Sequence, residues 1–376
     1  MDELKRLRHE LHKNPELSNK EADTALRLKF FLSSHKPDEL IQGVGGEGLL
    51  AVYRGAEPGP DVLFRADMDA LPIVEKNKLP YKSSKNGVAH MCGHDGHMAI
   101  LSGLAVYLSK HRPKRGRALL LYQPAEETGE GAYRALKDIQ KRGFKPEFAF
   151  ALHNMPRYPK GALLLNRGTF AAASKGMAIK LHGKSSHAAE PEKGLSPALA
   201  VARIIEGLIH LSKSASRFEE YVLLTIVYAK LGEVTFGTTP GYAEVGATLR
   251  AFKNSDMERL TTLSEELITR LAKEQNLTVE ISYTDDFPAT VNHSEAISYL
   301  ERSASKYGVP SVVLEQPNRW SEDFAHYSLA CKAAIFGLGS GTEHADLHSP
   351  SYDFPDEIIE PGVNLFKGIA EEILGH

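Results

Sequence analysis

The sequence predicts an α/β protein in which a mainly parallel, helix-covered sheet is interrupted by a smaller inserted domain. Between residues 49 and 152, short apolar strands alternate with helical segments, as in a parallel sheet with helical crossovers. Residues 177–283 change to the order β-α-β-β-α-β, and α/β features then resume. We therefore expect a discontinuous first domain, residues 1–175 and 291–376, and an inserted domain of residues 176–290.

The elements of the first domain follow from apolar spacing and from helix-capping residues. Leu4, Leu7 and Leu11 recur at helical spacing behind Asp2, a good N-cap. Ser18 is expected to cap a second helix that runs to about residue 34. The other expected elements are strands at 49–53, 62–64, 118–122, 148–152 and 333–338, and helices at 98–108, 131–141, 294–306 and 361–374.

The inserted domain begins with a strand in which Met177, Ile179 and Leu181 alternate with small or polar residues. Pro197 stands at the favoured first position of a helix. The order that follows is that of a complete ferredoxin-like unit. Its other elements are expected as a helix to residue 212, strands at 221–228 and 242–252, a helix at 256–273 and a strand at 277–283.

Composition argues against several classes of function. Lys and Arg total 45 against 48 Asp and Glu, so no basic excess favours nucleic acid as a partner. No apolar run approaches the roughly 20 residues that cross a bilayer, and the charged N-terminus does not resemble a secretory signal. Cys92 and Cys331 are the only cysteines, which excludes a disulfide scaffold and favours a cytoplasmic protein.

Four polar clusters stand at the ends of predicted strands or before a predicted helix. In an open α/β sheet, ligands bind outside the carboxyl ends of the strands, so clusters distant in sequence are expected to converge. This placement is a stronger argument than any single residue. The clusters are residues 65–69, 90–97 and 123–127, and His153.

Two of these clusters indicate metal-dependent hydrolysis. Cys92 and His94 lie in a glycine-containing loop, and thiolate, imidazole and carboxylate together suit zinc or a similar divalent metal. Glu126 and Glu127 are adjacent in a turn, so one can bind a metal ion while the other takes a proton from water. Alone, Cys-x-His more often marks a buried thiol with capping residues, and Glu-Glu a solvated turn. Alone, His187 and His348 indicate ordinary loop residues, and Arg250 an ordinary strand charge.

Taken in order, the motifs resemble the metallopeptidase family of aminoacylases and carboxypeptidases. The likeness is strongest to its branch of hippurate hydrolases, indole-acetyl-amino-acid hydrolases and N-acetyl-diaminopimelate deacetylases. It covers nearly the whole chain and implies a zinc-peptidase-like first domain. The motifs are Glu-Leu-His-Lys-Asn-Pro-Glu-Leu-Ser from 10, Phe-Arg-Ala-Asp-Met-Asp-Ala-Leu-Pro from 64, Cys-Gly-His-Asp-Gly-His from 92, Gln-Pro-Ala-Glu-Glu from 123, Leu-His at 152 and 347, His-Ala-Ala-Glu-Pro from 187 and Glu-Asp-Phe from 322.

The resemblance implies a role for each matched residue of the first domain. Glu126 matches the general base that activates a water and then protonates the leaving amine. Asp69 matches a carboxylate that supports the metal site without binding the metal. Two divalent metal ions are implied, zinc or manganese first, with nickel or cobalt as alternatives. Their ligands would be Cys92, His94, Glu127, His153 and His348.

The inserted domain matches a lid and dimerisation domain in the same family. His187 matches a histidine that reaches the partner subunit's site and stabilises the oxyanion. Arg250 matches an arginine that binds the substrate's carboxylate, which a guanidinium fork fits well. The implied protein is a homodimer that cleaves the amide bond of an N-acyl amino acid or a dipeptide.

Two positions depart from the family pattern. Gly237 stands thirteen residues before Arg250, where the family usually has Asn, and Thr238 or Thr239 are the nearest polar replacements. Trp320 stands where the family often has a small residue, and it would either line the acyl pocket or pack in the core.

Two other interpretations stay open at this point. A non-catalytic binding or regulatory protein could use the same scaffold, because a fold does not fix a function. A hydrolase with Cys92 as nucleophile is the second, and it would resist chelators. The complete set of ligands and base argues against both interpretations.

Overall fold

The computed structural model describes residues 1–375, which form two compact units. Residues 317–322 belong to the second unit, although no local pattern separates them from the sequence around them. No helix within residues 1–375 is both long and apolar enough to cross a membrane. The first unit comprises Met1–Phe170, Thr290–Gln316 and the chain from Asp323 onward, and the second comprises Ala171–Ala289 and Pro317–Glu322.

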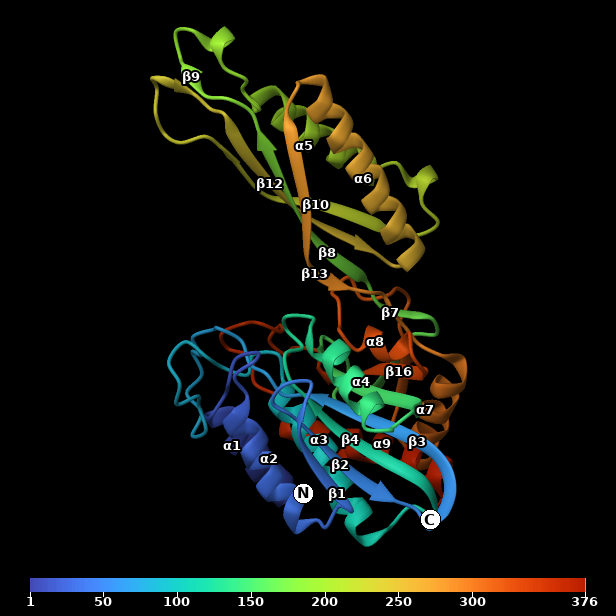
Figure 1. Ribbon diagram of the computed structural model, residues 1–376. Helices are drawn as coiled ribbons and strands as arrows, with labels where there is room; N and C mark the ends of the chain where they lie inside the picture. Colours follow the sequence, from blue (N-terminus) through green and yellow to red (C-terminus); the bar gives the residue numbers. More distant parts are fainter. Residues whose placement is uncertain (376) are drawn as a thin grey trace. The chain divides into compact units, whose positions relative to one another are not determined.

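An eight-stranded mixed sheet forms the centre of the first unit (Figure 1). Its strands are β1 (Glu39–Val44), β2 (Gly48–Arg54), β3 (Glu57–Asp67), β4 (Arg115–Gln123), β5 (Pro146–Pro156), β6 (Leu163–Leu165), β15 (Ser311–Val313) and β16 (Lys332–Gly341). They lie in the order β1-β2-β4-β3-β5-β16-β6-β15. The four central strands, β4, β3, β5 and β16, are parallel neighbours, which confirms the predicted sheet.

Helices cover both faces of this sheet. They are α1 (Asp2–Lys13), α2 (Ala22–Ser34), α3 (His94–Lys110), α4 (Gly131–Lys141), α7 (Ser294–Tyr307), α8 (Ala325–Ser328) and α9 (Ile359–Leu374), with the short 3₁₀ turn η3 (Asp356–Ile358). Apolar residues of α1, α2, α3, α7 and α9 share one core with Phe64 and Phe150 of the sheet. Leu119 and Leu121 alternate to the opposite face, and α4 contacts β4 there.

The second unit is a four-stranded antiparallel sheet with α5 and α6 packed into one core against it (Figure 1). Its main elements are β8 (Ala173–His182), α5 (Ala198–Ser212), β10 (Val222–Leu231), β12 (Tyr242–Ala251), α6 (Asn254–Glu274) and β13 (Thr278–Phe287). The order along the chain is the predicted β-α-β-β-α-β, and Met177, Ile179 and Leu181 are buried as expected. Shorter elements are β7 (Thr169–Ala171), β9 (Ser186–His187), η1 (Pro191–Lys193), η2 (Ala215–Arg217), β11 (Thr238–Thr239) and β14 (Thr290–Val291).

Several predicted helix starts were wrong. Helix α3 begins at His94, earlier than expected, because Gly93 adopts a left-handed φ of 94° that lets the chain turn into the helix. Ser18 does not cap α2; its hydroxyl instead donates to Asp69, 51 residues away. Asp2 lies in the first turn of α1 and Pro197 just before α5, each one place from its predicted position.

Candidate metal centre

The loops at the carboxyl ends of the parallel strands gather the candidate ligands of the first unit. Cys92 lies two residues before His94, which begins α3. Glu127 follows the end of β4. His153 was predicted to follow its strand, but it lies within the last residues of β5. His348 lies in the loop between β16 and α9, where its backbone N–H donates to the Met91 carbonyl at 2.8 Å.

These side chains lie within reach of common centres. The Cys92 Sγ and His153 Nε2 atoms are 3.5 Å apart. The Glu127 Oε1 atom lies 3.9 Å from His94 Nε2 and 3.7 Å from His348 Nε2. Within each of three overlapping groups, the ligating atoms lie within 4.8 Å of one another. The groups are Cys92 with His94 and His153, Cys92 with Glu127 and His348, and His94 with Glu126 and Glu127.

The polar atoms of this cluster fit a divalent cation. His94 Nε2 and Glu127 Oε1 are shielded from solvent, and neither has a hydrogen-bond partner among residues 1–375. Burial raises the pKa of the Cys92 thiol, and the Glu127 carboxylate adds to that effect. Burial also raises the pKa of Glu127 to about 7 and lowers that of His153 to about 3. A cation would favour the thiolate and carboxylate forms, and the neutral imidazole of His153 is already in its ligating form.

Glu126 faces the same cluster from an unusual turn. Its Oε2 atom lies 4.0 Å from His94 Nε2, and the residue is only 6% exposed. The preceding residue, Ala125, has a left-handed φ of 55°, which is rare for a residue with a Cβ atom. The turn therefore holds two adjacent carboxylates beside one set of imidazoles.

Asp69 supports the cluster from behind. Its backbone carbonyl accepts a hydrogen bond from His94 Nδ1 at 2.9 Å, which fixes the tautomer and leaves Nε2 toward the cluster. Its Oδ2 atom accepts from the Glu127 backbone N–H at 3.0 Å. Burial alone would raise the pKa of Asp69, but the contacts with His94, Ser18 and Glu127 outweigh burial and lower it.

The structure also brings in three buried residues to which sequence reasoning gave no role. His97 Nδ1 donates to Asp67 Oδ1 at 2.6 Å, and His97 Nε2 contacts the side chain of Asn154. Asp67 Oδ2 lies 3.8 Å from His94 Nε2. The three-residue spacing of His94 and His97 places both on one face of α3, but this signal was missed because the helix was predicted to begin only at residue 98.

The other three predicted site residues belong to the second unit. His187 is exposed on β9, where it pairs in register with Thr238. Arg250, on β12, donates through Nη1 to the Arg319 carbonyl at 2.8 Å and the Ser321 hydroxyl at 3.0 Å. Arg250 is therefore bonded to the two residues that flank Trp320, a half-buried side chain.

The Gly237 departure lies beside His187. The Gly237 carbonyl accepts from Ala188 N at 3.0 Å, and a Cβ atom at position 237 would meet nothing within 4 Å. Thr239 is engaged with the Ser186 hydroxyl at 2.7 Å, so Thr238 is the nearer candidate for a polar replacement.

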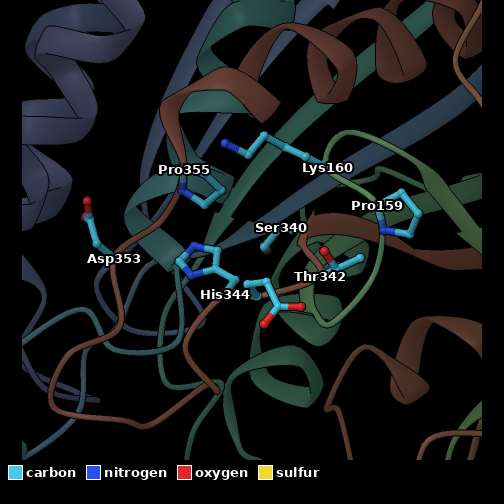
Figure 2. Close-up of a pocket in the computed structure, with 9 residues that line it drawn as sticks. Pro159, Lys160, Ser340, Thr342, His344, Asp353 and Pro355 are labelled. Carbon is cyan, nitrogen blue, oxygen red and sulfur yellow. The ribbon is translucent and has the colours of Figure 1, made fainter.

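A separate cavity of about 690 Å³ opens in the first unit (Figure 2). Lys160, Thr342 and His344 are among its lining residues, and none of the candidate ligands lines it. His344 stacks on the Tyr352 ring with centroids 5.2 Å apart. This cavity is thus distinct from the ligand cluster.

The fold and the cluster define a hydrolase of the α/β class with a candidate two-metal centre. The family model described as Peptidase family M20/M25/M40 matches residues 63–372. The chain therefore belongs to this peptidase family, which confirms the resemblance inferred from the motifs.

Relatives with established names are similar over almost the full chain. The IAA-amino acid hydrolase ILR1-like 5 of Arabidopsis thaliana is 31% identical over 98% of this chain and 86% of its own. The N-acetyldiaminopimelate deacetylase of Lactobacillus helveticus is 30% identical over 99% of this chain and 98% of its own. The crystal structure of Bacillus subtilis YXEP protein, a dinuclear metal-binding peptidase of the M20 family, has a TM-score of 0.86 at 26% identity, covering 99% and 98% of the two chains.

Proposed function

We propose that the protein hydrolyses the amide bond of small N-acyl amino acids or dipeptides with the help of two divalent metal ions. The observation that carries the proposal is the convergence of one thiol, three imidazoles and two adjacent carboxylates, drawn from residues 92–348, on one cluster. Relatives named as hydrolases and deacetylases of N-acylated amino acids support the substrate class. The neighbouring dinuclear peptidase supports the number of metal ions.

The proposed ligands are Cys92, His94, Glu127, His153 and His348, with zinc or manganese as the expected metals and nickel or cobalt as alternatives. When bound, the two ions supply Lewis acidity that polarises the scissile carbonyl and lowers the pKa of a water molecule. Asp69 orients His94 through its carbonyl and Glu127 through its carboxylate. Its role is therefore to hold ligands in place.

Glu126 is the proposed general base and acid. Its carboxylate accepts a proton from the attacking water and then donates it to the nitrogen of the leaving amine. The position of Glu126 supports this role, because its carboxylate lies in the same cluster as His94 and Glu127. The metal ions have five other candidate ligands, so Glu126 is not needed to bind them.

The second unit supplies substrate recognition in this proposal. Arg250 binds the substrate's carboxylate, Trp320 lines the acyl pocket, and His187 donates to the oxyanion of the tetrahedral intermediate. We place His187 in the partner subunit's site, so that the working enzyme is a homodimer assembled through the second unit. Both cysteines are free thiols, which suits the reducing cytoplasm as its location.

A thiol hydrolase is the second candidate, since Cys92 Sγ lies 3.5 Å from His153 Nε2. The raised pKa of Cys92 argues against it, because a nucleophilic cysteine needs a lowered pKa to be a thiolate. Chelation separates the two: loss of turnover with a chelator and recovery with zinc or manganese support the metal mechanism.

The decisive variant is Glu126→Gln, measured with N-acetyl and N-benzoyl amino acids and dipeptides. We expect kcat to fall by about 10²–10⁴-fold while metal content stays unchanged. Glu130→Gln, an exposed acid four residues along, is the matched control and should keep full activity. Full activity in Glu126→Gln would remove Glu126 as the base. Failure of the wild-type protein to release amine from any substrate would favour a non-catalytic protein.

A further inference from the structure

Glu21 has no role in the proposed reaction, yet it is buried against the turn that carries Glu126. It lies just before α2 and is 0% exposed. Its Oε1 atom accepts a hydrogen bond from the Ala125 backbone N–H at 2.8 Å. The two residues are 104 positions apart, so this contact is a product of the tertiary fold.

The turn that Glu21 contacts needs support. Ala125 is held at φ 55°, a left-handed conformation that is unfavourable for a residue with a Cβ atom. Such backbone persists where surrounding contacts determine it, and it concentrates at functional sites. The Ala125 carbonyl accepts from Gly131 N at 3.1 Å and from the Thr128 hydroxyl at 3.3 Å. Both of these partners lie within the turn itself, whereas the carboxylate that holds the Ala125 N–H group comes from outside it.

The backbone on the other side of Glu126 is fixed from the same segment of chain. Glu127 N donates to Asp69 Oδ2 at 3.0 Å, and the Ser18 hydroxyl donates to that same oxygen at 2.7 Å. Residues 18 and 21 therefore hold the amides on both sides of Glu126, one directly and one through Asp69.

We propose that Glu21 is a positioning residue for Glu126, acting through the Ala125 amide. This inference rests on the proposed function, because it requires Glu126 to be the base. Glu21 fixes the turn, and the turn aims the Glu126 carboxylate at the attacking water. Without the acceptor oxygen of Glu21, Ala125 relaxes toward a more favourable φ. The Glu126 carboxylate then moves away from the position in which it can take a proton from the water.

Glu21 needs only its acceptor oxygen for this role, not its charge. Burial raises the pKa of Glu21 to about 7, with the nearby Asp69 carboxylate adding to the effect. Oε1 accepts from Ala125 N in either form, because a proton can reside on Oε2. A glutamine at this position keeps an acceptor oxygen, whereas a methionine of similar size does not.

The test compares Glu21→Gln with Glu21→Met. We expect Glu21→Gln to keep kcat within about threefold, and Glu21→Met to lower kcat by about 10–100-fold with KM and metal content unchanged, the loss typical of a small misplacement. Hydrogen exchange gives a readout without turnover: a peptide covering residues 125–131 should exchange faster in Glu21→Met only. Adding Ala125→Gly to Glu21→Met should restore part of kcat, because glycine adopts a positive φ without cost.

Three results would overturn the inference. The first is wild-type kcat and exchange in a folded Glu21→Met variant. The second is an equal loss of kcat in Glu21→Gln and Glu21→Met. The third is a kcat loss that follows loss of metal in proportion. Each is distinct from failure of the proposed function, which shows instead as full activity in Glu126→Gln.

Discussion

Three candidate ligands of the first unit and the candidate residues of the second lie in opposite environments, although His348 of the first unit is itself exposed. In the first unit, Cys92, His94 and His153 are each no more than 6% exposed, and their neighbours are tied by hydrogen bonds. In the second, His187 is exposed and Arg250 is half-buried. A buried polar group costs free energy unless it is paired, so the first cluster is fixed in place by its surroundings. On the proposed function, this difference assigns bond cleavage to fixed side chains of the first unit and substrate recognition to more exposed side chains of the second.

The largest expected effect comes from mixing two inactive variants. Glu126→Gln changes a residue of the first unit and His187→Ala a residue of the second. If His187 acts in the partner's site, a dimer with one chain of each variant has one site in which both Glu126 and His187 are intact. Random exchange in a two-fold dimer should restore about a quarter of wild-type activity from near zero. Mixing Glu126→Gln with Asp69→Asn should restore nothing. No recovery in the first mixture, with dimers demonstrated, would place His187 in its own chain's site or outside catalysis.

The second prediction tests the buried framework through pH. His12 lies 2.9 Å from Asp95 and 3.4 Å from Glu75, beside Arg8. Burial alone would lower the pKa of His12, but the two acids outweigh burial and raise it from 6.5 to about 9. Because the pKa of His12 is higher in the folded than in the unfolded protein, protonated His12 stabilises the fold by roughly 3 kcal/mol below pH 6.5. This stabilisation is lost as the pH rises through 9. Urea unfolding of wild type and His12→Gln between pH 6 and 9.5 measures it. A difference in the free energy of unfolding between the two proteins that stays constant with pH would contradict the raised pKa of His12.

The third prediction concerns Asp69→Asn. We expect metal affinity and activity to fall by about 10–100-fold, because outer partners of metal ligands typically have effects of that size. Asp61→Asn is a matched control within β3, eight residues before Asp69, where Asp61 pairs with Arg117 at 2.5 Å. It should change stability and leave metal affinity unchanged. Equal metal loss in both variants would mean that Asp69 has no specific role.

The fourth prediction moves to the second unit. Arg250→Lys keeps the positive charge but loses the two parallel N–H donors of the guanidinium group that bind a carboxylate. We therefore expect KM to rise by about tenfold with kcat nearly unchanged. Arg203→Lys, on the outside of α5 near Glu274, should alter neither parameter. A fall in kcat at constant KM would assign Arg250 to the chemical step.

The smallest effect is expected at the Gly237 departure. Position 237 has open space for a side chain, so Gly237→Asn should fold normally. We expect a change of only a few-fold in KM, because the amide adds about one hydrogen bond to the substrate. The measurement is KM for an N-acyl amino acid alongside the melting temperature. A large loss of stability would show that the glycine is needed for the loop itself.

Much of the fold was accessible from the sequence because its signals are local. Helix α4 was predicted with its observed bounds, and the strands that end at the cluster were found from their apolar runs. Strands β6 and β15 have only three residues each, too few for a pattern, and β1 buries only one of its six residues.

The candidate site was accessible for a different reason. Parallel strands end at one edge, so Cys92, Glu127 and His153 were expected to meet before any distance was known. Ser18 and Glu21 were not accessible in this way, because Ser18 matched a helix cap locally and its actual partner lies 51 residues away. The support of a site is built from such tertiary contacts, which local sequence does not encode.

The most direct test of the central claim is the metal content of the purified protein after reconstitution with zinc or manganese. The account predicts two divalent ions per chain, no more than one in Cys92→Ala, and hydrolysis that stops on chelation. A protein that binds no metal ion and still hydrolyses N-acyl amino acids in the presence of a chelator would contradict it.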